Sequence, residues 1–273
     1  MLKVTIGQYI PGKSAMHRLD ARVKVVIGMV YVTMLFVANN LLALGIGAAL
    51  LVVMYPAAKI PGRLILRSLR PIIPIIIFTA VVNMFFVEGD IILLQIGPAA
   101  ISDRGIAVAL TMAIRIVALI SGTSLLTYTT TPITLTDALE RLFSPLKLLR
   151  LPVHEIAMMM TIALRFIPTL IEETDKIMSA QKARGADMES GSVVQRVKAL
   201  VPILIPLFVS AFRRADDLAL AMESRCYRDG KGRTRMRQLR MGLVDLCAGL
   251  FMVAFVAAVV LANVYAAQIG IVY

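Results

Sequence analysis

Two arginines lie between small residues at the predicted ends of two charged helical segments. The first lies in Ala183-Arg184-Gly185 and the second, 41 positions later, in Ser224-Arg225-Cys226. Gly185 is a natural residue to follow a helix end, because glycine adopts the left-handed conformation without a Cβ penalty. Small neighbours leave each guanidinium accessible for forked contacts with carboxylates in the groove of another protein. One copy would indicate ordinary helix capping, whereas two copies predict docking onto two related partner subunits.

The sequence contains none of the common catalytic signatures. It has no G-x-x-x-x-G-K-[ST] loop, no H-E-x-x-H motif and no G-x-S-x-G motif. Its two histidines, His17 and His154, are isolated. His17 and Asp20 have the spacing of a metal-binding pair on a helix face, although a solvated surface pair is the favoured interpretation. We predict a protein that is not itself an enzyme, with no catalytic residue, no metal and no cofactor.

The composition places these motifs in a membrane protein. Of the 273 residues, 59% are apolar and 17% are charged, against about 45–50% and about 25% in soluble domains. The mean hydropathy is +0.82. A disulfide scaffold does not fit, since Cys226 and Cys247 are the only cysteines. We expect an all-α, polytopic integral membrane protein.

Five stretches approach the roughly 20 apolar residues that a helix needs to cross a bilayer core about 30 Å thick. They are residues 23–38, 41–58, 71–87, 105–128 and 241–268. A shorter apolar segment, Ile91–Ile101, contains Gly97 and Pro98, which would interrupt a spanning helix. We therefore expect this segment to be interfacial or re-entrant.

The links between these spans alternate in charge, which predicts their orientation. The segment before the first span and the link between the second and third are basic, and the latter carries Lys59, Arg63, Arg67 and Arg70. The turn at Asn39 has no charge, and the link after the third span is mainly acidic. Cytoplasmic loops of membrane proteins collect lysine and arginine. We therefore expect a cytoplasmic N-terminus and an extracellular C-terminus.

The link between the fourth and fifth spans is unusually long. Residues 128–240 contain 18 basic and 12 acidic residues, together with the apolar runs Ile156–Ile171 and Leu200–Phe212. Each run continues into a charged helical pattern, Glu172–Lys182 and Arg213–Glu223. This predicts two long helices, each with one half at membrane or interface depth and the other in the cytosol. The alternative is two further membrane helices with ragged ends.

The chain is thereby expected to have three parts. Residues 1–127 form an N-terminal membrane region with spans one to four. Residues 128–240 form the region of the two long helices, and residues 241–273 form a C-terminal transmembrane helix.

The spans contain few ionisable groups. Arg115 lies near the middle of the fourth span and Asp245 near one end of the fifth. An ion or proton carrier needs such groups along its path, so a self-contained channel or secondary carrier is the alternative that we keep but do not favour. For Arg115 we favour a structural role, either paired with Asp245 or snorkelling to the surface, over substrate binding.

Two further surfaces are candidates for contacts. Met158, Met159 and Met160 form a soft patch, which is typical of surfaces that adapt to partners, although core filling explains it equally well. The basic run Arg228–Arg240 is expected to anchor the fifth span against anionic lipid. We expect no nucleic-acid binding, because aromatic residues are scarce there.

Over nearly its whole length, the sequence resembles the transmembrane T component of energy-coupling factor transporters, the EcfT/CbiQ family. Ala183-Arg184-Gly185 matches the Ala-Arg-Gly signature of that family, whereas Ser224-Arg225-Cys226 keeps only the arginine. The N-terminal run from Gly7 to Lys24 and the stretch from Asp137 to Pro168 are similar to the family pattern as well.

The resemblance implies a mechanical role in an ATP-driven importer. It implies that two coupling helices carry the arginine motifs into grooves of two ABC-type ATPase subunits and pass their motion to a small membrane subunit that binds the substrate, such as a vitamin or another micronutrient. By this resemblance Ala183, Arg184, Gly185, Ser224, Arg225 and Cys226 form the ATPase-docking residues. Met158, Met159 and Met160 are candidates for contact with the substrate-binding subunit. Because Cys226 replaces glycine, we expect the second helix to continue about one turn further, toward Gly230.

Overall fold

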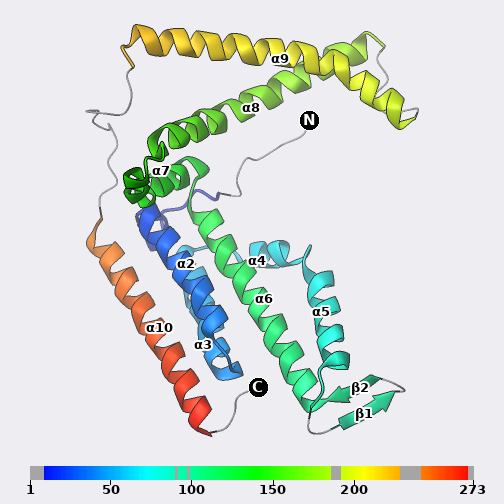
Figure 1. Ribbon diagram of the computed structural model, residues 1–273, viewed down its shortest axis with the longest axis vertical. Coiled ribbons are helices and arrows are strands. Elements are labelled where there is room, and N and C mark those ends of the chain that lie inside the picture. Colours follow the sequence, from blue (N-terminus) through cyan, green and yellow to red (C-terminus); the bar gives the residue numbers. More distant parts are fainter. Residues whose placement is uncertain (1–8, 90–91, 97–98, 186–191, 228–240, 270–273) are drawn as a thin grey trace. The chain divides into compact units, whose positions relative to one another are not determined.

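The described part of the chain folds into helices and a pair of short strands (Figure 1). The computed structural model describes residues 9–89, 92–96, 99–185, 192–227 and 241–269. The elements are α1 (Ala15–Arg18), α2 (Ala21–Val37), α3 (Leu41–Ala58), α4 (Gly62–Leu69), α5 (Ile73–Phe86), β1 (Ile92–Ile96), β2 (Ala99–Ser102), α6 (Asp103–Thr129), α7 (Pro132–Leu142), a 3-10 helix (Ser144–Leu149), α8 (Val153–Ala183), α9 (Val193–Ser224) and α10 (Leu243–Ile269).

These elements form two compact units. The bundle unit holds α1 to α6, both strands and α10, and the long-helix unit holds the 3-10 helix, α8 and α9; the boundary lies within α7. The last helix of the chain thus belongs to the same unit as the first six. The division into residues 1–127, 128–240 and 241–273 that the sequence suggests stays a prediction.

The core of the bundle unit lies between α2, α3, α6 and α10, which run side by side (Figure 1). Leu35, Leu44 and Val259 are fully buried there. Helices α2 and α6 approach closely at Gly122, where a Cβ would lie 2.3 Å from the ring of Tyr31. Small residues at helix contacts allow such an approach within a membrane.

Four helices of the described residues are long and apolar enough to cross a membrane, or five if α4 and α5 count as one broken span. The four are α3, α6, α8 and α10, so three predicted spans are confirmed and the apolar part of α8 adds one. Helix α2 has 17 residues, a length of about 26 Å. The chain is therefore a polytopic helical protein, as its composition predicts.

The third predicted span is not one straight helix. Over residues 71–87 only α5 is helical, with 14 residues, and α5 is bent by 62° from the preceding α4. Pro71 and Pro74 explain the break, because proline lacks a backbone donor and restricts the residue before it.

The segment Ile91–Ile101 does not form a membrane helix. Its described residues pair as the antiparallel strands β1 and β2. The hydroxyl of Ser102, at the end of β2, donates to the carbonyl of Val87 (2.7 Å) and accepts from the N–H of Gly105 (2.9 Å). It thereby ties the end of α5 to the start of α6.

Polar side chains of α10 tie the two ends of the bundle unit. At one end, the Asp245 carboxylate of α10 accepts from the backbone N–H groups of Asp20 (2.7 Å) and Gly242 (2.7 Å). At the other end, the Asn263 side chain of α10 accepts from the N–H of Asn39 (3.2 Å) and donates to the carbonyl of Val37 (2.8 Å). The bonds of Asp20, Asn39 and Val37 join the two ends of α2 to residues more than 200 positions away.

The expected pairing of Arg115 with Asp245 is wrong. The Arg115 guanidinium donates to the carbonyl of Ala38 (2.6 Å), at the C-terminal end of α2. A cation there is favoured because the last carbonyls of a helix carry partial negative charge. Asp245 lies at the opposite end of α2, near Asp20, so the two charges are about 26 Å apart along the bundle.

The expected solvated pair of His17 and Asp20 is wrong as well. The His17 ring lies within hydrogen-bond distance of the carbonyl of Ile10 (2.9 Å) and the hydroxyl of Ser14 (2.6 Å). The Asp20 carboxylate is buried and pairs with Arg22 (3.1 Å). Both side chains therefore hold the chain that enters α2.

The long-helix unit consists mainly of α8 and α9, with 31 and 32 residues (Figure 1). Both are continuous although Pro168, Pro202 and Pro206 lie inside them. This confirms the two long helices predicted from the apolar and charged halves. Their depth in the membrane stays a prediction.

Candidate docking site

The end of α8 has the geometry that the first arginine motif predicts. Arg184 is the C-cap, and its N–H bonds to the carbonyl of Ala180 (3.2 Å). Gly185 follows with φ of 86°, and its N–H bonds to the carbonyl of Lys182 (3.0 Å). The left-handed glycine ends the helix and leaves Arg184 as its last side chain.

The end of α9 has the same geometry, although its left-handed residue is a cysteine. Helix α9 ends at Ser224, and Cys226 has φ of 54°. The N–H of Cys226 bonds to the carbonyl of Glu223 (2.8 Å) and that of Tyr227 to Met222 (2.9 Å). These two bonds make a Schellman motif with Arg225 as the C-cap. Both arginines therefore occupy the same position relative to their helix ends.

The expected extension of α9 toward Gly230 is therefore wrong at its first step, and Gly230 itself lies outside the described residues. A left-handed conformation costs a residue with a Cβ about 1–2 kcal/mol. The contact that follows it opposes this cost: the Tyr227 hydroxyl donates to Sδ of Met158 on α8 (2.9 Å). Sequence reasoning gave Tyr227 no partner, because Met158 lies 69 positions earlier.

Both arginine motifs are open to a partner. The six residues of the two motifs are all exposed. Neither Arg184 nor Arg225 has a hydrogen-bond or ion-pair partner within the part of the chain that the structure describes. Two unpaired guanidinium groups on fixed helix ends are well placed for carboxylate or backbone acceptors of another protein.

The two motifs lie at opposite ends of an antiparallel helix pair. Three contacts set the register: Tyr227 with Met158, Arg214 with Glu173, and the Gln181 side chain with the carbonyl of Pro202 (3.4 Å). Arg225 thus lies beside the start of α8, whereas Arg184 lies at its end. From Met158 to Ala183 the helix rises about 37 Å at about 1.5 Å per residue. The register therefore separates the two docking arginines by a distance of this order.

The predicted methionine patch divides into two parts. Met158 is half-buried and accepts the hydrogen bond of Tyr227, so it packs within the long-helix unit. Met159 and Met160 are 57% and 45% exposed. Only these two remain available to a partner.

A second exposed surface lies on α9, mostly within the apolar run Leu200–Phe212 that the sequence predicts at membrane or interface depth. Helix α9 carries many exposed apolar side chains, and five of them follow one another at helical spacing between positions 197 and 212. They are Val197, Val201, Ile205, Phe208 and Phe212. We call these five residues the α9 stripe. The spacing of three and four residues is its signal in the sequence, and an exposed apolar stripe marks a protein or membrane contact.

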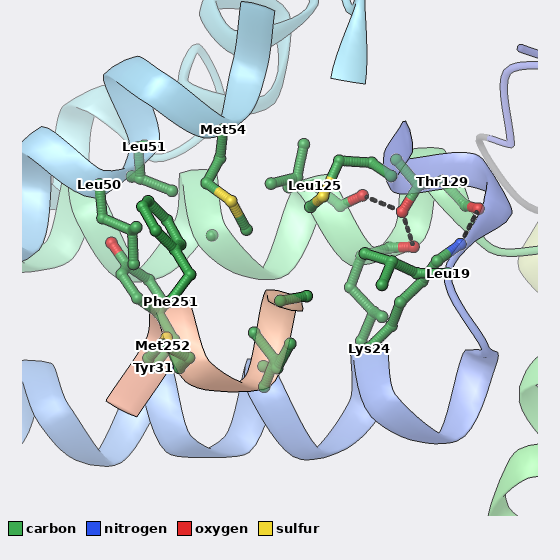
Figure 2. Close-up of a pocket in the computed structure, with 16 residues that line it drawn as sticks. Leu19, Lys24, Tyr31, Leu50, Leu51, Met54, Leu125, Thr129, Phe251 and Met252 are labelled. Carbon is green, nitrogen blue, oxygen red and sulfur yellow. Dashed lines mark hydrogen bonds between the residues drawn. The ribbon is translucent and has the colours of Figure 1, made fainter. Parts of the chain in front are cut away.

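The bundle unit contains a cavity that is too small for a typical ligand (Figure 2). It measures about 80 Å³, whereas ligand pockets measure about 300–1,000 Å³. Its wall is apolar apart from the region of Lys24 and Thr129, and the Lys24 ammonium donates to the carbonyl of Thr129 (2.9 Å). Lys24 therefore has a structural role, because this bond joins α2 to the end of α6. Within the described ranges, no three potential metal-ligating side chains come together.

Comparison with known proteins places the chain in a family. The family described as "CbiQ: Cobalt transport protein" matches residues 12–236. The chain is also similar to proteins named energy-coupling factor transporter transmembrane protein EcfT. The protein of Thermosediminibacter oceani is 52% identical over 91% of this chain and 93% of its own length. That of Clostridium kluyveri is 48% identical over 96% and 97%, and that of Bacillus subtilis 47% over 88% and 90%.

These relatives match nearly the whole chain, so the similarity covers both the membrane helices and the two arginine motifs. The chain belongs to the EcfT/CbiQ family and is a multi-pass, non-catalytic transmembrane component of an energy-coupling factor transporter.

Proposed function

We propose that the chain mechanically couples two ABC-type ATPase subunits to a separate small membrane subunit that binds a vitamin or another micronutrient. The observation that carries the proposal is the pair of exposed arginines at matching left-handed helix ends, neither of which has a partner among the described residues. Ala183, Arg184 and Gly185 dock one ATPase subunit, and Ser224, Arg225 and Cys226 dock the other. Two equivalent sites suit two related subunits that move relative to each other.

The connection between α8 and α9 supports transmission of that motion. Each helix is continuous for more than 30 residues, and the Arg214–Glu173 ion pair joins them near the middle of their contact. A displacement at one arginine motif therefore moves a stiff element rather than a loop. Coupling between two distant sites requires a rigid element that can adopt two arrangements, so that each site influences which arrangement is populated.

The α9 stripe supports a role in contacting the substrate-binding subunit. It is apolar and exposed, and it lies between the two ends that dock the ATPases. Met159 and Met160 extend an adaptable surface on the neighbouring helix. We assign these residues to the face that receives the small subunit, so movement of α9 reaches that subunit directly.

The bonds at the two ends of the bundle unit support a cytoplasmic N-terminus and an extracellular C-terminus. Asp20 and Asp245 share one end with the basic residues Arg18, Arg22 and Lys24. Asn39, Asn40 and Asn263 share the other end, which carries no charge from α2, α3 or α10. By the positive-inside rule the basic end faces the cytosol. The long helices between α7 and α10 then belong to the cytoplasmic side.

Impermeant thiol labelling tests this orientation. In a chain with Cys226 and Cys247 replaced by serine, Asn39→Cys is expected to react in intact cells, because Asn39 is exposed at the uncharged end. Ser179→Cys, exposed on α8, is expected to react only after permeabilisation. Labelling of position 179 but not 39 in intact cells would show that the orientation is inverted.

Co-purification from the native membrane tests the function. We expect two ABC-type ATPase subunits and one small, apolar membrane protein to accompany the chain, and the small protein identifies the substrate. Recovery of the chain alone, or only as a homo-oligomer that supports transport without ATP, would favour a self-contained channel or carrier instead.

A further inference from the structure

Three helix ends of the bundle unit meet at a cluster of buried charged residues. The ends are the starts of α2 and α10 and the end of α6. The charges belong to Asp20, Lys24 and Asp245, whose exposed fractions are 6%, 7% and 8%. Charges that leave water are costly unless they are paired and hydrogen-bonded. The bonds of this cluster therefore fix the three helix ends relative to one another.

One carboxylate of the cluster holds the starts of two helices. Asp245 is the third residue of α10, and its Oδ2 accepts the N–H of Gly242, which directly precedes that helix (2.7 Å). Its Oδ1 accepts the N–H of Asp20, the N-cap of α2 (2.7 Å). The N–H groups at a helix start lack partners within the helix and carry partial positive charge, which a carboxylate satisfies. Asp245 thus joins α10 to α2 at this end of the bundle unit.

One ammonium of the cluster adds the end of α6. The Lys24 side chain extends from the first turn of α2 and donates to the carbonyl of Thr129, the last residue of α6 (2.9 Å; Figure 2). The last carbonyls of a helix carry partial negative charge, so a cation is favoured there. Asp245 and Asp20 attract the same ammonium. We call Asp20, Lys24, Thr129, Gly242 and Asp245 the three-helix joint.

The three-helix joint lies close to two connections between the bundle unit and the long-helix unit. The bundle unit comprises residues 7–138 and 238–273. The chain therefore leaves it nine residues after Thr129 and returns to it four residues before Gly242. At the other end of the bundle unit, Asn263 also ties α10 to α2, but neither of these connections begins there.

We propose that Lys24 and Asp245 are positioning residues for coupling, which hold both connections to α2 while the ATPase subunits move the long helices. This inference rests on the proposed function. A pull on α8 or α9 reaches the bundle unit along the chain, through α7 and through the segment before α10. With the joint closed, the pull acts on three packed helices together. With the joint broken, it separates the start of α10 from α2, and the motion is lost within the bundle unit.

Distances between two spin labels test whether the joint stays closed when the ATPase subunits bind nucleotide. Arg18→Cys and Met241→Cys, both exposed, place the labels beside the joint in a chain with Cys226 and Cys247 replaced by serine. In the assembled complex we expect the same distance distribution with and without a non-hydrolysable ATP analogue. In Asp245→Ala we expect the analogue to broaden it. A distribution that changes with the analogue while the joint is intact would overturn the proposal, even if Asp245→Ala failed to assemble.

Uptake per ATP hydrolysed tests the role of the joint in coupling. Asn263→Ala is the matched control for Asp245→Ala, because Asn263 lies on the same helix and ties it to α2 through Asn39 (3.2 Å) and Val37 (2.8 Å). The assembled transporter is reconstituted in proteoliposomes, with a mixture of tritiated riboflavin, folate, thiamine and biotin as the probe. We expect Asp245→Ala to lower uptake per ATP about tenfold while the ATPase subunits stay bound, and Asn263→Ala to leave it unchanged.

A substitution of the lysine completes the test. Lys24→Met removes the donor and the charge at similar length, and we expect the same loss of uptake per ATP as in Asp245→Ala. Absence of ATP-dependent uptake in wild type would count against the proposed function and its substrate class, and the spin-label distances would still decide whether the joint holds. ATP-dependent uptake in wild type with equal uptake per ATP in Asp245→Ala and Asn263→Ala would overturn the role of the joint and leave the proposed function standing.

Discussion

Replacing both Arg184 and Arg225 with glutamate is expected to abolish association with the ATPase subunits while the chain still inserts into the membrane. Both side chains are exposed and without partners in the described structure, so the fold does not depend on them. An arginine central to an interface costs about 2–4 kcal/mol on truncation. Two such losses weaken association by about 10³-fold or more, since about 1.4 kcal/mol is tenfold. Charge reversal adds repulsion from the carboxylates that received the guanidinium groups.

The measurement is co-purification of the ATPase subunits with the tagged chain, together with the ATPase activity of the isolated complex. Lys176→Glu with Arg213→Glu is the matched control, because it reverses two exposed charges within the same helices, away from their ends. Cys226→Gly keeps the left-handed turn and is expected to retain docking. If the double variant of Arg184 and Arg225 assembled normally with the ATPase subunits, the two motifs would be helix caps and not docking sites.

The single variants separate the two sites. Arg184 and Arg225 lie at opposite ends of the α8–α9 pair, a separation of about 37 Å by helix rise, so we expect each of them to dock its own ATPase subunit. We expect Arg184→Glu and Arg225→Glu each to leave one subunit bound, with transport lost in both cases. If either single variant released both subunits, the two sites would not be independent.

Gly122→Ala is expected to destabilise the bundle unit by about 1–3 kcal/mol, the usual cost of overpacking a core. A Cβ at Gly122 would lie 2.3 Å from Cε1 and 2.7 Å from Cδ1 of Tyr31. Tyr31 is buried and its hydroxyl donates to the carbonyl of Ala118 (3.4 Å). The ring therefore cannot move without loss of packing, and α2 must separate from α6.

Thermal unfolding of the purified protein in detergent measures this effect. Gly45→Ala on α3 is the matched control, because a Cβ there meets no atom within 4 Å. Combining Gly122→Ala with Tyr31→Leu is expected to cost less than the sum of the two single changes, since the smaller side chain relieves the overlap. A Gly122→Ala protein as stable as Gly45→Ala, or strict additivity in the double variant, would show that the close approach does not constrain the bundle.

The sequence by itself determined the class of the protein, three of its membrane helices and the chemistry of its docking groups. Apolar runs such as Leu41–Ala58 are local in the chain, and their length and apolar composition together identify them as candidate membrane spans. The helix end at Arg184 is local as well, since Gly185 supplies the left-handed residue that ends a helix. These features depend on neighbours a few residues away, which a sequence displays directly.

Only the tertiary structure decided which distant groups meet. Arg115 has Ala38 as its partner, 77 positions away, rather than Asp245. Tyr227 reaches Met158 on the other long helix, beside the left-handed Cys226 that ends α9. A groove between α3, α4 and α6 is lined by residues that lie between positions 48 and 121 of the sequence. The type of a residue shows that it needs a partner, but depth and helix register select the partner, and both are set when the helices pack.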